Sequence, residues 1–144
     1  MCGSCANEVA FKAAFMRYQN IKRGGSGVAF TQEELSSCMK NRAPGSPELS
    51  ILSFEGAFHG RTFATLSATR SKELHKLDIP AFDWPAAPFP KLQYPLEQFA
   101  EENDKEEQRC LKAVEQLIDT WQKPVAAVIV EVSRQTRKEA QGGR

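Results

Sequence analysis

The sequence lacks the long apolar run that a membrane-spanning helix needs. Such a span takes about 18 or more consecutive apolar residues, and the longest run here, residues 125–130, has six. An excess of one charge is also absent, because 19 Lys and Arg oppose 18 Asp and Glu and leave a net charge of +1. Proteins that bind nucleic acid usually carry a basic face. The two absences argue against a membrane-spanning protein and against nucleic acid as a partner.

Cysteine is scarce, with four in 144 residues, at positions 2, 5, 38 and 110. Small secreted domains that depend on disulfides carry a far higher density. The first residues, MCGSCANE, lack both the basic start and the apolar stretch of a secretion signal. We therefore expect a reducing, intracellular compartment. The composition, 41% hydrophobic and 26% charged, is that of a globular protein and excludes a wholly disordered chain.

Four segments have helical character. Apolar residues recur at helical spacing in the longer ones. Asn7 is the expected N-cap of the first helix, and Thr31 with Glu34 forms the expected capping box of the second. The four helices are expected within residues 8–23, 31–39, 61–70 and 96–121.

Two segments, residues 49–54 and 125–131, have the short, mostly apolar character of buried strands. Their alternation with helices indicates an α/β unit with parallel strands. Residues 78–95 carry five of the eight prolines, so no regular structure is expected there, although three aromatic residues favour an ordered, packed loop. Because sheets of this class usually have about five or six strands, the chain is expected to be part of a larger sheet.

Three stretches together resemble a known family: MCGSCANEVAFKAAFMRY, ILSFEGAFHGRTFATLSATRS and HKLDIPAFDWPAAPFPKLQYPLE. They are similar to the 4-aminobutyrate aminotransferases, a family of class-III, pyridoxal-phosphate-dependent enzymes. AFHGRT is typical of the whole class, and C-G-S-C followed by NE is typical of this family. The resemblance covers residues 1–131 and implies an incomplete part of the large domain of a fold-type-I aminotransferase. Residues 132–144 depart from the family pattern and are expected to be a divergent basic tail, not native to the fold.

The resemblance also implies a reaction. The family transfers the amino group of 4-aminobutyrate to 2-oxoglutarate, which becomes glutamate, through pyridoxal phosphate, as a homodimer in the mitochondrial matrix. The family's Schiff-base lysine and the aspartate that pairs with the pyridine nitrogen have no counterpart here, and no transit peptide is seen. We therefore expect no catalytic residue in this chain and no activity from the 144-residue chain alone.

Gly3 and Ser4 stand just before the first predicted helix, where N–H groups and the helix dipole favour an anion. From the residues alone this is a weak signal, and the resemblance implies that both bind the phosphate of pyridoxal phosphate. It further implies that Phe58 covers the cofactor ring, with His59 close by. Arg61 is implied to bind the substrate carboxylate, for which a guanidinium offers a fork of two hydrogen bonds.

Glu131 ends the last predicted strand, at the edge where α/β sites collect. The family has a glutamate at this position and a second one five residues later. Thr136 stands at the second position here. The switching of arginine partners between the two substrates is therefore not expected of this chain.

Cys2 and Cys5 form a C-x-x-C pair, which brings two thiolates within reach of one metal ion. A thioredoxin-like redox pair, half of a zinc site and plain buried thiols remain open as alternatives. The resemblance implies a [2Fe–2S] cluster shared across the dimer, with two thiolates from each chain. Cys38 and Cys110 are expected to be buried as small hydrophobic residues.

Two other functions remain open from the sequence. The chain could be a non-catalytic short isoform that binds full-length subunits, in which case it co-purifies with them. It could also be a small C-x-x-C redox or metal module, which would form a reversible disulfide and have no affinity for pyridoxal phosphate.

Overall fold

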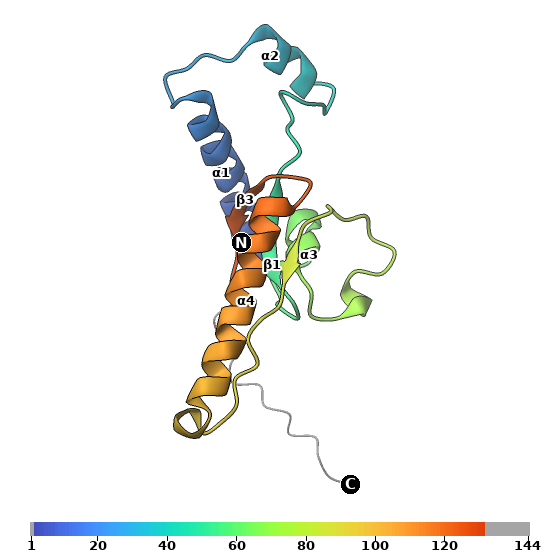
Figure 1. Cartoon of the computed structure of the whole chain (residues 1–144). Coiled ribbons are helices and arrows are strands. Elements are labelled where there is room, and N and C mark those ends of the chain that lie inside the picture. The colour runs from blue at the N-terminus through green and yellow to red at the C-terminus, as the bar shows by residue number, and fades with distance from the viewer. Residues whose placement is uncertain (1, 132–144) are drawn as a thin grey trace.

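A computed structural model of the chain describes residues 2–131; Met1 and the segment 132–144, where a basic tail was expected, lie outside the described residues. Three parallel strands form a sheet in the order β2-β1-β3. The central strand β1 spans Ser50–Phe54, β2 spans Ala86–Ala87 and β3 spans Val125–Val128. Figure 1 shows this sheet at the centre of the molecule. The expected α/β fold with parallel strands is confirmed.

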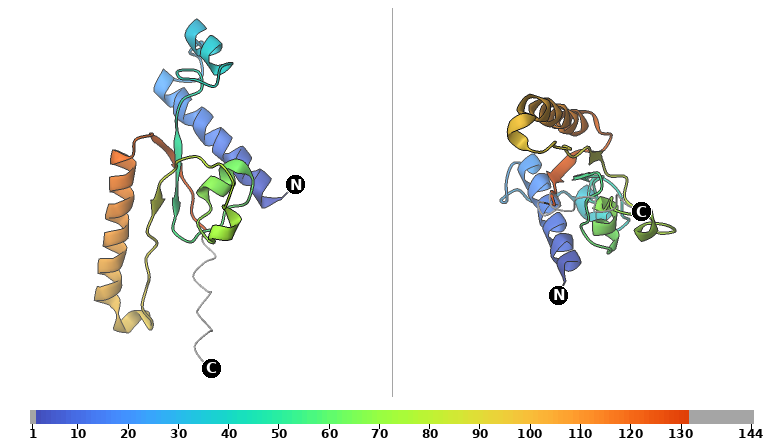
Figure 2. Two further views of the ribbon diagram at one scale, coloured as in Figure 1. Left: turned by 90° about the vertical axis from the view of Figure 1, so that its right-hand side faces the viewer. Right: turned by 90° about the horizontal axis from the view of Figure 1, so that it is seen from below.

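Helices cover both faces of the sheet, as Figure 2 shows. On one face lie α1, Gly3–Arg23, and α3, Phe63–Ala68, and on the other lies α4, Ala100–Thr120. The short helix α2, Gln32–Cys38, lies beyond the end of α1. Two 3₁₀ turns, η1 and η2, complete the described elements and span Glu73–His75 and Leu96–Gln98.

Helix α1 begins five residues earlier than the sequence predicted. Its N-cap is Cys2, so the prediction of Asn7 as the N-cap is wrong, and Asn7 lies inside the helix. Cysteine is not a favoured N-cap and glycine is a poor helix former, so the local sequence gave no start signal here. At the other end Gly24 adopts a left-handed conformation (φ 103°) and caps the helix.

Only some of the large apolar residues of α1 face the core. Phe11 is buried and Phe15 packs against the core, whereas three other large apolar residues of the helix are largely exposed. The half-buried positions before Phe11 are polar. The exposed residues are Val9, Met16 and Ile21.

The proline-rich segment contains strand β2, so the prediction that regular structure is excluded there is wrong. Proline lacks an N–H, but β2 contributes carbonyl groups to the sheet. The Ser53 N–H donates to the Pro85 carbonyl at 3.1 Å, and the Glu55 N–H donates to the Ala87 carbonyl at 2.8 Å. Pro85 and Pro88 flank the two-residue strand, and Pro85 takes part through its carbonyl, so the missing proline N–H is tolerated there.

The remaining predicted elements are confirmed with changed bounds. The capping box of Thr31 and Glu34 is present. The third helix is shorter than predicted, and the fourth is preceded by the separate turn η2. Because β1 and β3 are parallel, their carboxyl ends lie at the same edge of the sheet.

The core joins α1 to the sheet and to the proline-rich segment. Phe11, Ile51, Ala68 and Trp84 form a buried cluster. Trp84 meets Phe11 edge to face at 5.7 Å between ring centroids, and its indole N–H donates to the Leu49 carbonyl at 3.1 Å. The expectation of a packed, ordered loop is confirmed for Trp84. Within residues 2–131, no helix has the length and apolar character needed to cross a bilayer.

Candidate functional site

The carboxyl ends of β1 and β3 bring Phe58 and Glu131 together. Phe58 follows β1 by four residues and Glu131 follows β3 by three. The Phe58 N–H donates to a carboxylate oxygen of Glu131 at 2.9 Å. The Phe58 side chain is 41% exposed, and its ring meets the His75 ring edge to face at 5.6 Å. Its accessible ring surface therefore lies at the strand edge where ligands of α/β proteins bind.

Gly3 and Ser4 lie in the first turn of α1, not before the helix as the sequence predicted. The first N–H to bond within the helix is that of Ala6, which donates to the Cys2 carbonyl at 3.1 Å. The N–H groups of Gly3, Ser4 and Cys5 precede it and have no intrahelical acceptor. Cys2 supplies no side-chain cap, and the first turn holds no acidic residue. This terminus has the donors and the dipole that an anion such as phosphate requires.

Ser4 connects this helix terminus to Arg61. Its Oγ accepts a hydrogen bond from the Arg61 N–H at 3.4 Å. The adjacent Gly60 has a φ of +128°, and a Cβ there would lie 2.4 Å from Ser4 Oγ. Only glycine allows so close an approach in that conformation. Because Ser4 Oγ acts as the acceptor in this contact, its hydroxyl hydrogen is not used there and can be donated to another group.

The Arg61 side chain is exposed, and its guanidinium has no ion-pair partner among residues 2–131. Five N–H donors in a planar fork are therefore available to a carboxylate. The hydrogen bond from the Arg61 main-chain N–H to Ser4 Oγ places the backbone of Arg61 beside the N-terminus of α1.

Two residues of α1 that the sequence did not single out for the site contact the turn of residues 59–65. The Asn7 side chain donates to the His59 carbonyl at 2.8 Å. The Glu8 carboxylate accepts from the N–H groups of Ala64 and Thr65 at 3.0 and 3.1 Å. A signal was present, since Ser4, Asn7 and Glu8 are polar residues at i, i+3 and i+4 and therefore share one helix face.

His59 is buried behind this turn, 6% exposed, and its Nε2 has no hydrogen-bond partner. Burial lowers the pKa of the imidazole below 6.5, and the nearby negative charge of Glu131 opposes that shift. The neutral imidazole is therefore favoured. The His59 N–H and the Gly60 carbonyl both bond to Thr69 Oγ1, so the main chain of the turn is held from this side as well.

Cys2 and Cys5 are both exposed and free, with their sulfur atoms 3.5 Å apart. The reading of the pair as plain buried thiols is therefore wrong. The nearby N–H group and thiol of Cys5, and the N–H group of Ser4, favour the thiolate and so lower the pKa of Cys2. Across residues 2–131 no group of three or more histidine, cysteine or acidic side chains could hold a metal ion. A metal at this pair would need further ligands from outside the described residues.

The other two cysteines differ from each other. Cys110 is 3% exposed, which confirms the expectation of a buried thiol, and burial raises its pKa. Cys38 is only half-buried, at the end of α2. Its position corrects the prediction that both are buried.

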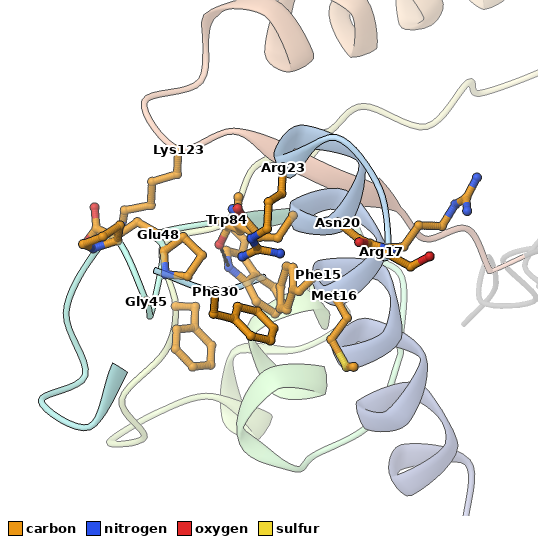
Figure 3. Close-up of a pocket in the computed structure, with 16 residues that line it drawn as sticks. Phe15, Met16, Arg17, Asn20, Arg23, Phe30, Gly45, Glu48, Trp84 and Lys123 are labelled. Carbon is orange, nitrogen blue, oxygen red and sulfur yellow. Dashed lines mark hydrogen bonds between the residues drawn. The ribbon is translucent and has the colours of Figure 1, made fainter. Parts of the chain in front are cut away.

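A cavity of about 830 Å³ lies at the opposite end of α1, away from the residues described above (Figure 3). Phe15, Phe30 and Trp84 line its apolar part, and Arg23 and Lys123 also line it. The Arg23 guanidinium is already paired with Glu34 at 2.8 Å. None of the residues that the sequence singled out for the cofactor or the substrate lines this cavity.

Comparison with known proteins identifies relatives for nearly the whole chain. The family model of class-III aminotransferases matches residues 1–136. The 4-aminobutyrate aminotransferase of Dictyostelium discoideum is 70% identical over 131 residues, which cover 91% of this chain and 26% of that protein. The mitochondrial 4-aminobutyrate aminotransferase of Sus scrofa is 59% identical over 133 residues, covering 90% and 26%. The chain thus spans about a quarter of the length of the curated relatives it matches.

A solved structure supports the same relationship. The lysine aminotransferase from M. tuberculosis superposes with a TM-score of 0.61 at 25% sequence identity, over 90% of this chain and 26% of that one. The strand order, the parallel sheet and the two helix layers are thus found within a larger aminotransferase. Pyridoxal phosphate is the cofactor expected of this family, and mammalian relatives are named mitochondrial. The chain belongs to the class-III aminotransferase family.

Proposed function

We propose that residues 2–131 supply the phosphate-binding helix terminus and the substrate-binding arginine of a 4-aminobutyrate aminotransferase. The reaction is transfer of the amino group of 4-aminobutyrate to 2-oxoglutarate, with glutamate as the product. Pyridoxal phosphate, when bound, supplies the electron sink that stabilises the carbanion beside the transferred nitrogen. The identity of 70% to a 4-aminobutyrate aminotransferase supports this substrate class.

Gly3 and Ser4 bind the cofactor phosphate in this proposal. The N–H groups of the first turn, which have no intrahelical acceptor, donate to phosphate oxygens, and the Ser4 hydroxyl adds a further donor. The structure fits this role because α1 begins without a side-chain cap or an acidic residue. A carboxylate in the first turn would compete with the phosphate for the same donors.

Phe58 and Arg61 contact the cofactor ring and the substrate in this proposal. The exposed face of Phe58 packs against the cofactor ring and excludes water from it. Arg61 binds the substrate carboxylate through its guanidinium fork. The neutral His59, buried beside Phe58, supports the turn and adds no charge near the cofactor.

The observation that carries this proposal is the juxtaposition of the open terminus of α1 with Arg61 through Ser4 Oγ. We would titrate the 144-residue chain with pyridoxal phosphate by absorbance, with inorganic phosphate as competitor. Ser4→Ala is expected to weaken binding about tenfold, which corresponds to one lost charge-assisted hydrogen bond of about 1.4 kcal/mol. Arg61→Lys keeps the charge and should leave this affinity within about twofold.

The matched control is Ser36→Ala, an exposed serine on α2. It should bind the cofactor as the parent chain does. Equal affinity of Ser4→Ala and Ser36→Ala would refute the phosphate site, as would a lack of competition by inorganic phosphate.

Turnover is a separate question. The family's cofactor-binding lysine has no expected counterpart in the sequence, so we predict no glutamate formation by the purified 144-residue chain with cofactor and both substrates. Glutamate measured above the level of a cofactor-only blank would contradict this.

For Cys2 and Cys5 we propose that two copies of the chain hold one [2Fe–2S] cluster between them. Two exposed thiols 3.5 Å apart are suited to ligate one iron, and a two-fold axis would provide the second pair. Anaerobic reconstitution with iron and sulfide should give one iron per chain and a dimer. A monomer that binds no iron and forms a reversible intramolecular disulfide would favour the small redox module instead.

We further propose that the whole protein works in the mitochondrial matrix, because its mammalian relatives are named mitochondrial. We also propose that it is a homodimer, as the resemblance to the family implies. The alternative, a non-catalytic isoform that binds full-length subunits, is decided by recovery from mitochondria with an antibody to the N-terminal residues. A complex with full-length enzyme at a fixed ratio would favour the isoform.

A further inference from the structure

The turn of residues 59–65 is held against α1 by three side chains on one face of that helix. Ser4, Asn7 and Glu8 stand at i, i+3 and i+4, and all three are half-buried. Ser4 and Asn7 contact the main chain in the first half of the turn. Glu8 contacts its second half, where α3 begins. One helix face therefore spans the whole turn.

A single carboxylate oxygen of Glu8 receives three hydrogen bonds. They come from the Thr62 hydroxyl and from the N–H groups of Ala64 and Thr65, the latter two at 3.0 and 3.1 Å. This places a negative charge at the N-terminus of α3, where the dipole stabilises it. Because α3 has only six residues, it is too short to be stable alone and depends on such tertiary contacts.

The backbone of the turn lies so close to α1 that Gly60 has no room for a side chain. An added Cβ at Gly60 would lie 2.4 Å from Ser4 Oγ and 2.7 Å from Thr65 Oγ1. Thr65 belongs to the N-terminus that Glu8 caps, so both ends of the turn meet at the same place. A movement of the α3 terminus therefore also moves the main chain of Arg61 relative to Ser4.

We infer that Glu8 is a positioning residue of the site: by capping α3 from α1, it holds Arg61 beside Ser4 and the phosphate-binding terminus. This inference rests on the proposed function for the role of that terminus. The described contacts of Glu8 are all with the turn, so its assigned role is to act through the turn and not on the cofactor or the substrate.

The test compares Glu8→Ala and Glu8→Gln with the control Glu115→Gln, an exposed glutamate on α4. Two quantities are measured on the full 144-residue chain: amide hydrogen exchange by NMR and the dissociation constant for pyridoxal phosphate. Glu8→Ala should speed exchange at Arg61 and Thr65 at least tenfold, while exchange at Ile129, whose N–H donates to the Leu52 carbonyl of β1, stays unchanged. It should weaken cofactor binding about fivefold.

Glu8→Gln keeps an acceptor oxygen in the same place and loses only the charge. It should retain the fold and recover most of the protection and most of the affinity, which a general loss of stability would not do. Glu115→Gln should change neither quantity.

Unchanged exchange at Arg61 and Thr65 in Glu8→Ala would overturn the inference. Faster exchange with unchanged affinity, while Ser4→Ala weakens binding, would also overturn it and leave the proposed function intact. If Ser4→Ala does not weaken binding, the proposed phosphate site fails, and exchange at Arg61 alone then decides whether Glu8 positions the turn.

Discussion

The N-termini of α1 and α3 meet at one turn, and they differ in how they are capped. Helix α3 has Thr62 in a capping box and the Glu8 carboxylate on its first N–H groups. Helix α1 has a cysteine N-cap with no side-chain bond and no acidic residue in its first turn. The same helix α1 thus supplies an anion to its neighbour and none to itself. A helix terminus without a capping anion, beside one that has such an anion, indicates where an external anion binds.

The largest expected effect comes from separating the two termini. Gly60→Ala would place a methyl group 2.4 Å from Ser4 Oγ at a φ of +128°. Backbone strain and overpacking together should lower the free energy of unfolding by about 2–5 kcal/mol. Urea denaturation measures this.

The control for that variant is Gly25→Ala, which has a similar φ of +119° but no neighbour within 4 Å. It should show the strain without the clash and lose about 1–2 kcal/mol. Equal losses in the two variants would mean that the close approach of the turn to α1 does not matter.

A smaller loss should follow removal of one bond between the helix and the turn. Asn7→Ala deletes the donor to the His59 carbonyl and should lower the free energy of unfolding by about 1 kcal/mol. Gln19→Ala, on the same helix near the cavity, is the reference. If both variants unfold at the same urea concentration as the parent chain, the Asn7 contact is not formed in solution.

Closing the open terminus should act in the opposite direction on stability. Cys2→Asp introduces a favoured N-cap and a negative charge at α1, and should raise the free energy of unfolding by about 0.5–1 kcal/mol. The same change should weaken pyridoxal phosphate binding at least tenfold, because the carboxylate occupies the donors. Cys2→Asn is the neutral comparison, with the stability gain and a smaller loss of affinity. Tighter binding in Cys2→Asp would contradict the open-terminus explanation.

The smallest effect concerns His59, which lies in the turn between the two helix termini. Burial lowers its pKa below 6.5 in the folded chain, so the unfolded chain takes up a proton first as the pH falls. The stabilisation that comes from keeping His59 neutral is fully present above about pH 6.5, and it is lost as the pH falls through the lower pKa of the folded chain. His59→Gln should therefore reduce the slope of stability against pH below 6.5, as measured by thermal unfolding between pH 5 and 8. An unchanged slope would show that titratable groups other than His59 cause the pH dependence of stability.

The sequence predicted those elements whose signals are local. The valine-rich strand and the Thr31 capping box depend on neighbouring residues, and both are present. Strand β2 has two residues and no pattern of its own, because it is defined only by its pairing with β1. Its detection requires the partner strand.

The candidate site divides in the same way. Gly3, Ser4, Phe58 and Arg61 were singled out through short motifs and a resemblance. Glu8 was not, because its partners lie more than 50 residues along the chain and only folding brings them together. The polar face before Phe11 was the available signal, and apolar periodicity does not reveal such a face.

The spacing of Ser4, Asn7 and Glu8 also limits how this segment can change in length. One residue inserted between Ser4 and Asn7 would rotate the helix start by about 100° relative to the rest. The phosphate donors would then point away from the turn while Asn7 and Glu8 still bound it. Insertions after Gly24, where the chain leaves the helix and Gly25 has open space around it, carry no such penalty. Length variation should therefore be tolerated after α1 and excluded from its first two turns.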